Sequence, residues 1–453
     1  MYIDFLMEGF TRNREKEAII WKDKSFNYQW LVDRVQFWRE EIQKHNITSG
    51  TVVILEADFS PIALALLLVL IEKNCIIVPL TSSVESQKPE FIEIAEGEIL
   101  FRIDEDDKLT ISKRPHSAAH RFIKQLKQSK KPGLVLFSSG STGKSKASLS
   151  DFSSILNKFK VSRHSLRTIA FLLFDHIGGI NTLLYTLSNA GCVVAVNNRS
   201  PEGVLSSIEK YKVELLPTSP TFINLVLLSE AYKRYNLSSL KTITYGTEPM
   251  PESTLKRLHE LFPNIQLKQT YGLSELGILR SKSKGSDSLW VKVGGEDFQT
   301  RIIDGLLEVK AKSAMLGYLN APSPFTEDGW FKTGDSVLTD GEYIKILGRE
   351  SEIINVGGEK VYPTEVESVI QNIDNVAEVT VYGKKNAITG NMVCAKVRLV
   401  KQEDPKVFSA TLKKYCRKKL QPFKVPVKVE IVDKQQYSQR FKKSRADNVS
   451  CDN

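Results

Sequence analysis

Phe137-Ser138-Ser139-Gly140-Ser141-Thr142-Gly143-Lys144-Ser145-Lys146 follows directly on the apolar run at residues 134–137. Small hydroxyl residues and glycines let backbone N–H groups approach a phosphate closely, and the two lysines add positive charge. A nucleotide P-loop needs a glycine where Ser138 stands, so this string is not one. Because it directly follows an apolar strand, we favour a phosphate-binding loop over a flexible Ser/Gly linker.

Short apolar runs alternate with helical stretches on both sides of this loop. The run at 61–72 is predicted to be a helix, and its apolar part is too short to cross a bilayer, which takes about 20 residues. Such alternation predicts α/β layering with largely parallel sheets. The predicted strands of this part are 52–55, 76–80, 134–137, 169–174, 192–196 and 242–245.

From about residue 290 the pattern changes to short strands joined by tight turns. Strands are predicted at 300–303, 306–309 and 343–346, with Asp304-Gly305 as a hairpin turn. The segment after residue 348 reads strand, helix, strand, strand, helix, strand. We therefore expect a core domain over 1–348 and a small α+β domain over 349–453.

The bulk composition limits the class of protein. A chain of 453 residues is long for one hydrophobic core, and its five cysteines are scattered without metal-site spacing. The N-terminus lacks the apolar run of a secretory signal, so a cytoplasmic setting is expected. The net charge of +10 suggests anionic partners, but no nucleic-acid-binding signature is present, so nucleic acid is not an expected partner.

Four further strings follow the phosphate-binding loop, and together the five resemble the ordered signatures of the adenylate-forming superfamily. That superfamily includes acyl-CoA synthetases, peptide-synthetase adenylation domains and luciferases, which are AMP-dependent synthetases and ligases. The resemblance spans residues 137–363 and implies a large N-terminal domain of layered α/β sheets with a small β-barrel part, and a small mobile α+β C-terminal domain. The four strings are Tyr245-Gly246-Thr247-Glu248-Pro249, Thr270-Tyr271-Gly272-Leu273-Ser274-Glu275, Gly329-Trp330-Phe331-Lys332-Thr333-Gly334-Asp335, and Gly348-Arg349 continued by Gly357-Gly358-Glu359-Lys360-Val361-Tyr362-Pro363.

The resemblance implies an ATP site with a role for each string. Glu275 is expected to hold Mg²⁺, because a hard cation bridging phosphates needs carboxylate oxygen. Tyr271 is expected to stack on the adenine, Ser274 to reach the α-phosphate, and Asp335 and Arg349 to hold the ribose. The remaining expected ATP-binding residues are Ser138, Ser139, Gly140, Ser141, Thr142, Gly143, Lys144, Lys146, Gly246, Thr247, Glu248, Pro249, Thr270 and Gly272.

The C-terminal region resembles the small domain of the family, which rotates to serve the two half-reactions in turn. The family's catalytic lysine stands in a Gly-Lys-x-x-Arg setting, which is matched here by Phe441-Lys442-Lys443-Ser444-Arg445 with Phe441 in place of the glycine. Lys442 is the assigned catalytic residue and Lys443 the alternative. Ser351 occupies the hinge position, where aspartate or lysine is usual. The thiol or pantetheine loop is expected at Gly357, Gly358, Glu359 and Lys360.

The acid pocket is expected around Phe174-Asp175-His176-Ile177-Gly178. This string resembles the Phe-His-x-x-Gly string of thiol-ligating members, with Asp175 inserted, and makes His176 a candidate catalytic residue. Peptide-synthetase domains use an aspartate in this region to pair with a substrate ammonium, so Asp175 leaves an amino-acid substrate open. The other expected pocket walls are Gly178, Thr218, Gly246, Gly272 and Gly277.

The combined reading is an ATP- and Mg²⁺-dependent acid–thiol ligase. It would activate a carboxylic acid as acyl-AMP and pass the acyl group to coenzyme A or to the phosphopantetheine of an acyl carrier protein, working free-standing because no carrier domain is visible. The alternative is an amino-acid adenylating enzyme that loads a carrier protein. A non-catalytic homologue is a third possibility, supported only by Phe441 and Ser351.

Overall fold

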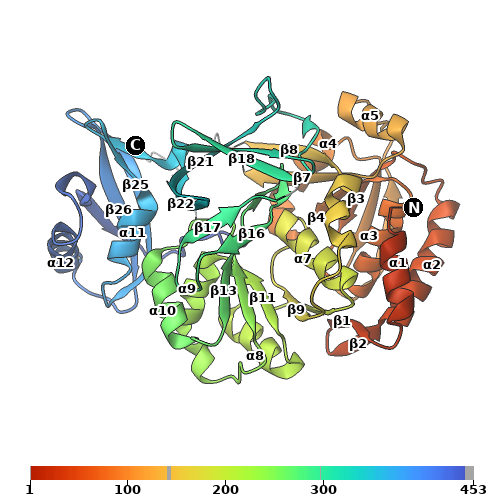
Figure 1. The fold of residues 1–453 in the computed structure, drawn as a ribbon, viewed down its shortest axis with the longest axis horizontal. Coiled ribbons are helices and arrows are strands. Elements are labelled where there is room, and N and C mark those ends of the chain that lie inside the picture. Colours follow the sequence, from red (N-terminus) through yellow and green to blue (C-terminus); the bar gives the residue numbers. More distant parts are fainter. Residues whose placement is uncertain (1, 140–143, 296, 444–453) are drawn as a thin grey trace.

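The computed structural model describes residues 2–139, 144–295 and 297–443. Within these residues the chain is a mixed α/β protein with a large N-terminal part of layered sheets and a smaller C-terminal unit, as predicted (Figure 1). Two mostly parallel seven-stranded sheets form the large part. No helix in the described part of the chain is long and apolar enough to span a membrane.

One seven-stranded sheet carries the start of the phosphate-binding loop. Its central strands β7, β4, β3 and β5 run parallel, and β8, β20 and β6 run antiparallel to their neighbours. Ser139 is the last residue of β7, so the loop leaves the sheet where the sequence analysis places it. In spatial order the strands are β20 (Gly317–Tyr318), β8 (Ser145–Asp151), β7 (Gly133–Ser139), β4 (Ile76–Leu80), β3 (Val52–Glu56), β5 (Ile99–Ile103) and β6 (Leu109–Lys113).

The other seven-stranded sheet supplies most of the candidate site. The strand predicted at 169–174 ends at Ala170, because the chain then turns into helix α7, with the His176 N–H donating to the Leu173 carbonyl. In spatial order the strands are β13 (Gln266–Gln269), β12 (Thr242–Tyr245), β11 (Leu215–Thr218), β9 (Arg167–Ala170), β10 (Cys192–Ala195), β1 (Glu17–Trp21) and β2 (Lys24–Asn27).

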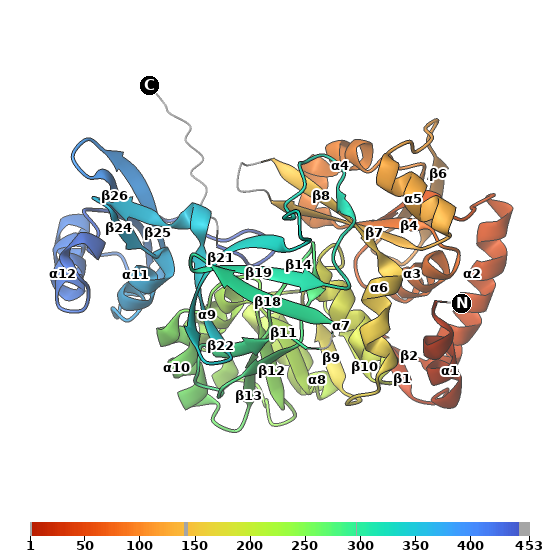
Figure 2. The ribbon, with the colours of Figure 1, turned by 45° about the horizontal axis from the view of Figure 1, so that its top comes forward.

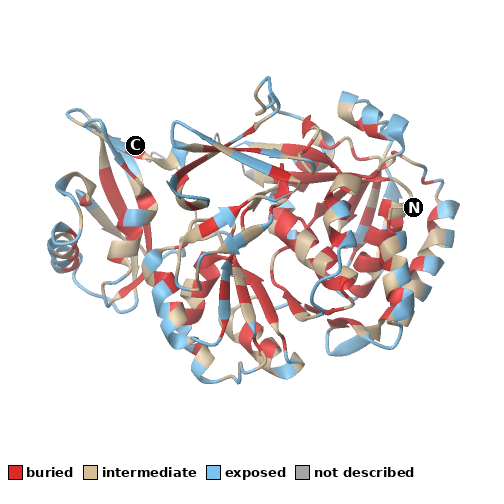
Figure 3. Cartoon of the chain, in the orientation of Figure 1, coloured by how far each residue is buried: buried red, intermediate tan, exposed pale blue. Residues whose placement is uncertain are grey.

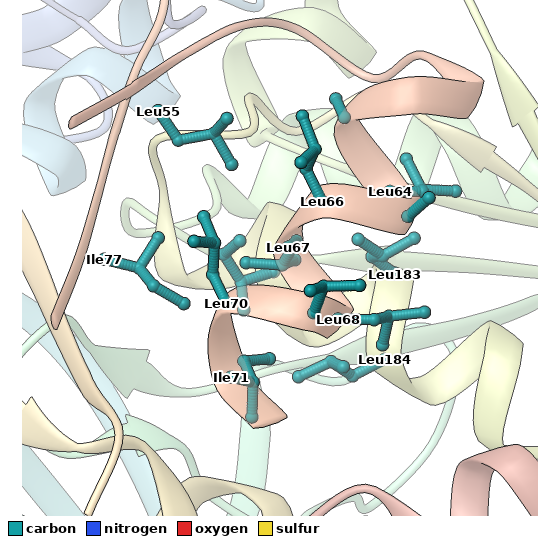
Figure 4. Close-up of a cluster of buried hydrophobic side chains, with 14 of the residues drawn as sticks. Leu55, Leu64, Leu66, Leu67, Leu68, Leu70, Ile71, Ile77, Leu183 and Leu184 are labelled. Atoms are coloured by element: carbon teal, nitrogen blue, oxygen red, sulfur yellow. The ribbon is translucent and has the colours of Figure 1, made fainter. Parts of the chain in front are cut away.

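Helix α3 (Pro61–Glu72) shows how the two sheets are joined. Ser60 caps it by accepting from the Ala63 N–H, and Pro61 fits the first helical position, where no N–H is needed. It is apolar all round because it is covered on all sides, as the burial colouring indicates (Figure 3). Its leucines pack against Leu55 and Ile77 of one sheet and against Leu183 and Leu184 of α7 (Figure 4).

The other helices of the N-terminal part cover the two sheets. They are α1 (Asp4–Arg12), α2 (Tyr28–Lys44), α4 (Lys88–Ile94), α5 (Arg121–Ser129), α6 (Phe152–Leu156), α7 (Ile177–Ser188), α8 (Pro201–Tyr211), α9 (Pro220–Ser229) and α10 (Glu252–Leu261), with the short 3-10 helices η1 (Ser82–Gln87), η2 (Asn157–Lys160) and η3 (Ala231–Lys233).

Six strands between residues 281 and 349 form an antiparallel sheet. Asp304 and Gly305 both have positive φ, 51° and 79°, as a two-residue hairpin turn requires. The sheet is open, where the sequence led us to expect a small barrel: its edge β16 lies against β13, with Ser281 Oγ donating to the Gln269 carbonyl at 2.9 Å. Its strands, in spatial order, are β16 (Ser281–Ser283), β17 (Trp290–Val293), β22 (Tyr343–Arg349), β21 (Phe331–Asp340), β19 (Leu306–Ala311) and β18 (Phe298–Ile303); β14 (Gly272–Leu273) and β15 (Gly277–Ile278) pair separately.

The C-terminal unit has a core of its own around Val366, Phe408 and Leu412. Two short strands, Ile354–Val356 and Glu359–Val361, precede its first helix where the sequence predicted one, and the order of elements after that helix is as predicted. The unit lies beside α9 and α10 (Figure 2): Ser368 hydrogen-bonds to Ser253 of α10, and Asn224 Nδ2 of α9 donates to the Ala377 carbonyl. Its elements are η4 (Glu350–Glu352), β23 (Ile354–Val356), β24 (Glu359–Val361), α11 (Pro363–Ile370), β25 (Val376–Asn386), β26 (Gly390–Leu399), α12 (Pro405–Arg417), η5 (Pro422–Lys424) and β27 (Lys428–Ile431).

Candidate active site

The carboxyl ends of three parallel strands bring distant predicted residues together. Thr218, Tyr245 and Gln269 lie side by side at the ends of β11, β12 and β13. The Gly246 N–H donates to the Thr218 carbonyl at 3.3 Å, and a Cβ at Gly246 would lie 2.6 Å from Thr270 Oγ1. Glycine is therefore required by a close approach of the chain, at the edge of the sheet where α/β proteins bind ligands.

Asp335 and Arg349 face each other on the paired strands β21 and β22. Arg349 Nε lies 2.8 Å from Asp335 Oδ1, and the Tyr271 hydroxyl donates to Oδ2 at 2.6 Å. Burial raises the pKa of Asp335, while the Arg349 charge and the Tyr271 hydrogen bond act against that rise. The Tyr271 ring packs in the core of the six-stranded sheet, so its expected stacking on adenine stays a prediction.

Glu275 lies beside the start of the phosphate-binding loop. The Tyr318 hydroxyl donates to Glu275 Oε1 at 2.8 Å, and Ser138 Oγ is 3.5 Å from the same oxygen. The described residues contain no cluster of three or more metal-ligating side chains. A single carboxylate next to a phosphate loop fits Mg²⁺, which keeps waters and takes its other ligands from the substrate phosphates.

Only some of the other predicted phosphate-binding residues can be placed relative to Glu275. Gly140, Ser141, Thr142 and Gly143 lie outside the described residues. Lys144 is exposed, and Lys146 Nζ lies 5.4 Å from the centre of the Tyr318 ring. Gly272 and Ser274 stand between Tyr271 and Glu275, and a Cβ at Gly272 would be 2.7 Å from the Gly277 carbonyl.

Glu248 connects this site with the C-terminal unit. Its Oε1 accepts from the N–H and the hydroxyl of Thr221, and its Oε2 accepts from the Lys443 N–H at 3.1 Å. Thr247, one residue earlier, has a positive φ of 74°, and Pro249 follows. The string predicted to line the adenine thus also holds residues near the end of the chain.

Lys442 lies close enough to act electrostatically on predicted nucleotide and acid residues. Burial lowers the pKa of Lys442, the Glu248 charge opposes this, and the Arg349 and Arg440 charges lower it further. Its own charge acts in turn on Asp335 and on His176. The alternative, Lys443, points elsewhere: its Nζ lies 2.9 Å from Glu367, a buried carboxylate of the small unit.

His176 and Asp175 begin helix α7. His176 Nδ1 accepts from the Gly178 N–H at 3.0 Å, which caps the helix. Burial lowers the pKa of His176 to about 3, aided by the Lys442 and Arg440 charges, so the ring is neutral and carries its proton on Nε2. Asp175 is almost fully buried and pairs with Arg440, whose Nη2 is 3.0 Å from Oδ2.

The predicted thiol loop is not brought to the other site residues. Gly357, Gly358, Glu359 and Lys360 are all exposed on the β23–β24 hairpin. Gly358 has a φ of 93° and its N–H donates to Asn355 Oδ1 at 2.9 Å. Ser351 is exposed in η4, directly after β22.

Comparison with known proteins identifies the group to which this arrangement belongs. The pattern of the AMP-binding enzymes matches residues 7–294, and that of the AMP-binding enzyme C-terminal domain matches residues 365–442. The chain belongs to the AMP-binding enzyme family. This confirms the resemblance that the five ordered strings indicate.

Curated relatives of this AMP-binding enzyme include named CoA ligases. A long-chain-fatty-acid–CoA ligase of Haemophilus influenzae is 30% identical over 272 residues, 56% of this chain and 48% of that protein. A 2-succinylbenzoate–CoA ligase of Enterococcus faecalis is 26% identical over 357 residues, 73% of this chain and 72% of that protein. The chain spans about half the length of the first relatives it matches, 48% and 52%.

Solved structures share the fold of this AMP-binding enzyme over nearly its whole length. An anthranilate–CoA ligase in complex with anthranoyl-AMP has a TM-score of 0.80 at 17% identity, covering 96% of this chain and 93% of that one. An o-succinylbenzoate–CoA synthetase from Bacillus subtilis in complex with its acyl-adenylate intermediate has a TM-score of 0.77 at 22% identity, covering 97% and 96%. At these identities the likeness establishes the fold.

Three features of this AMP-binding enzyme's site were missed from the sequence. Tyr318 reaches Glu275 from a two-residue strand with no motif of its own. Burial lowers the pKa of Lys158 to about 7, and its ammonium donates to Asn181 on α7 and to the Ile278 carbonyl on β15, which ties two expected pocket walls together. The third is Arg440, whose only sequence signal is its place two residues before Lys442.

A cavity of about 790 Å³ lies beside this site. It is bordered by Thr81 and Leu173 from the N-terminal part and by Ser438 and Phe441 from the C-terminal unit, and Arg199 and Arg398 stand on its wall. Thr81 donates to the same Asp175 oxygen that pairs with Arg440. The cavity therefore borders the expected acid pocket.

Proposed function

We propose that this AMP-binding enzyme is an ATP-dependent acid–thiol ligase. It activates a carboxylic acid as acyl-AMP with release of pyrophosphate, and then transfers the acyl group to a thiol. Coenzyme A is the favoured acceptor because the named relatives are CoA ligases, and a carrier-protein phosphopantetheine is the other candidate.

The observation that carries the proposal is the position of Lys442. A cation from the C-terminal loop acts electrostatically on Asp335, expected at the ribose, and on His176, expected at the acid. A positive charge that acts on both positions suits the reaction, because negative charge accumulates where the acid carboxylate meets the α-phosphate. Non-catalytic binding gives no reason to hold a lysine there.

The first half-reaction follows from this arrangement. A carboxylate oxygen of the acid attacks the α-phosphorus of ATP, the bond to the β-phosphate oxygen breaks, and pyrophosphate leaves. Lys442 stabilises the developing charge, while Asp335 and Arg349 hold the nucleotide in line. Glu275 would hold Mg²⁺, which supplies charge neutralisation on the phosphates when bound.

The second half-reaction requires the thiol loop to reach the site. The thiol sulfur attacks the acyl carbon, the bond to the AMP oxygen breaks, and AMP leaves. We propose that residues 349–453 rotate against 1–348 about Ser351, so that Gly357–Lys360 replaces Lys442 next to the adenylate. The exposure of that loop supports this proposal, since it leaves the loop free to move into the site.

The test is pyrophosphate release from purified protein across a panel of carboxylic acids, with and without coenzyme A. Acid-dependent release of pyrophosphate, followed by thioester formation only when a thiol is present, is the expected result. Absence of release with every acid, in protein that binds ATP, would overturn the proposal. Equal release with and without a thiol, with no thioester formed, would leave an adenylating enzyme for another acceptor.

A further inference from the structure

Asp175 is a buried carboxylate that depends on a distant part of the chain. Its side chain is 2% exposed, its Oδ2 accepts from the Thr81 hydroxyl at 3.0 Å and from Arg440 Nη2 at 3.0 Å, and its Oδ1 has no partner among the described residues. A buried carboxylate without a counter-charge is strongly destabilising. Arg440 therefore neutralises Asp175 from the C-terminal loop.

The residues after Arg440 fix the same loop to the N-terminal part. Phe441 stands where the family resemblance leads us to expect glycine, and its φ of 49° is unusual for a residue with a side chain. The centre of its ring lies 5.1 Å from the ring centre of Phe171 and 5.4 Å from that of Phe222. Its carbonyl accepts from Ser219 Oγ at 2.7 Å. These contacts offset the backbone strain.

Lys442 lies between these attachments. Arg440 and Phe441 hold the loop on one side, and on the other the Lys443 N–H donates to Glu248. We propose that Arg440 is a positioning residue that holds Lys442 in the adenylate-forming site by pairing with Asp175, and that this pair excludes acids carrying a protonated 2-amino group. The inference rests on the proposed function, and it names a substrate class for it.

The substrate consequence follows from charge. In an amino-acid adenylating enzyme, an aspartate at this position would pair with the substrate ammonium. Here the charge of that carboxylate is already paired, through Oδ2, with an arginine of the same chain. A substrate ammonium would have to displace Arg440 or lie beside its positive charge, and both cost free energy. The acid is therefore one without a charged amine.

The kinetic test separates the two half-reactions. Arg440→Gln should slow acid-dependent ATP–pyrophosphate exchange between about tenfold and a hundredfold, because a misplaced catalytic group has this effect. Thioester formation from supplied acyl-adenylate should stay near the wild-type rate, since Lys442 acts only in the first step. Arg440→Lys should recover part of the loss, and Asp175→Asn together with Arg440→Gln should be no worse than Arg440→Gln alone. Unchanged exchange, equal loss in both steps, or additive losses would each overturn the inference.

A second measurement does not depend on activity. Hydrogen exchange should show the amides of residues 438–443 protected in the wild type and exposed in Arg440→Gln, with the β25–β26 amides unchanged as the internal control. Identical exchange in both proteins would overturn the positioning role even if the wild type adenylated nothing. Wild-type protein without activity but with loop protection lost in the variant would instead remove the proposed function alone.

The substrate class is tested with matched acids. Wild type should use its preferred acid far better than the 2-amino derivative of that acid, and Arg440→Gln should narrow the difference by freeing Asp175. Wild-type preference for the amino derivative would overturn the exclusion.

Discussion

Two loops of the same small unit are in opposite situations. Residues 438–443 are attached to the N-terminal part through Asp175, Ser219 and Glu248. Residues 357–360 are exposed, and apart from the adjoining residues no heavy atom of the described chain lies within 4 Å of a Cβ placed on Gly357 or Gly358. The same unit therefore presents one loop to the site while the other faces solvent.

The difference between the two loops bears on which of the two proposed half-reactions this position of the small unit would serve. The Lys442 charge acts on Asp335 and His176, whereas residues 357–360, the predicted thiol loop, are exposed. The proposed second half-reaction would therefore require a second position of the unit, in which residues 357–360 reach the site. Because the two loops lie in different places, each can be mutated without changing the contacts of the other.

The largest effect is expected from Lys442→Ala. Loss of one positioned charge should slow ATP–pyrophosphate exchange by about 10²–10³-fold, by analogy with the loss of an oxyanion donor. Lys434→Ala, at an exposed lysine of the same segment, is the matched control and should keep wild-type exchange. Lys443→Ala should mainly lower the melting temperature, because it leaves the buried Glu367 without its cation. A larger loss of exchange in Lys443→Ala than in Lys442→Ala would reverse the assignment of the two lysines.

Glu275→Gln should weaken the use of Mg²⁺ without affecting either loop. The concentration of Mg²⁺ that gives half-maximal exchange should rise between about tenfold and a hundredfold. Tyr318→Phe removes the hydrogen bond to Glu275 but keeps the carboxylate, and it should give a smaller rise. Exchange titrated with Mg²⁺ checks both variants. An unchanged midpoint in Glu275→Gln would remove the metal assignment.

Gly358→Leu should spare exchange and lower thioester formation at least about tenfold, because a side chain would obstruct the thiol. The φ of 93° makes any side chain strained there, so the control must carry the same strain. Gly341→Leu, at an exposed turn with a φ of 57°, is that control and should leave both steps near normal. Both half-reactions are measured on one preparation of folded protein. Parallel loss of the two steps in Gly358→Leu alone would argue against separate loops.

The smallest expected effect is on the pH dependence of stability at His176, whose pKa is lowered in part by the Lys442 and Arg440 charges of the attached loop. The pKa of His176 is about 3 in the folded chain, below its ordinary value of 6.5, so the unfolded state binds more protons between these values. The free energy of unfolding should therefore fall as pH drops from 6.5, by up to about 1.4 kcal/mol per pH unit from this group. His176→Asn keeps a helix cap but does not titrate, so its unfolding free energy should fall less steeply between pH 6.5 and 5. If denaturant titrations give the wild type and His176→Asn the same pH dependence of the unfolding free energy, then His176 does not contribute to it.

Local patterns predicted most of the elements. The helix at 61–72, the Asp304-Gly305 turn and the order strand, strand, helix, strand after residue 370 follow from apolar periodicity and turn chemistry, which depend on neighbours in sequence. The predictions of a strand over 169–174 and of a small barrel were wrong because both features depend on contacts between segments far apart in the chain. Ala170 ends its strand because the chain turns toward α7, which His176 caps, and β16 lies against β13, and neither constraint is visible within a short window of sequence.

The sequence by itself determined the family, the order of its signatures and the candidate residues, because each signature is a short string whose chemistry is local. Only the tertiary structure decided that Lys443 pairs with Glu367, that Asp175 pairs with Arg440, and that Phe441 packs in an aromatic cluster. These contacts join residues far apart in the chain. Their energies come from burial and charge pairing, which exist only once the chain has folded.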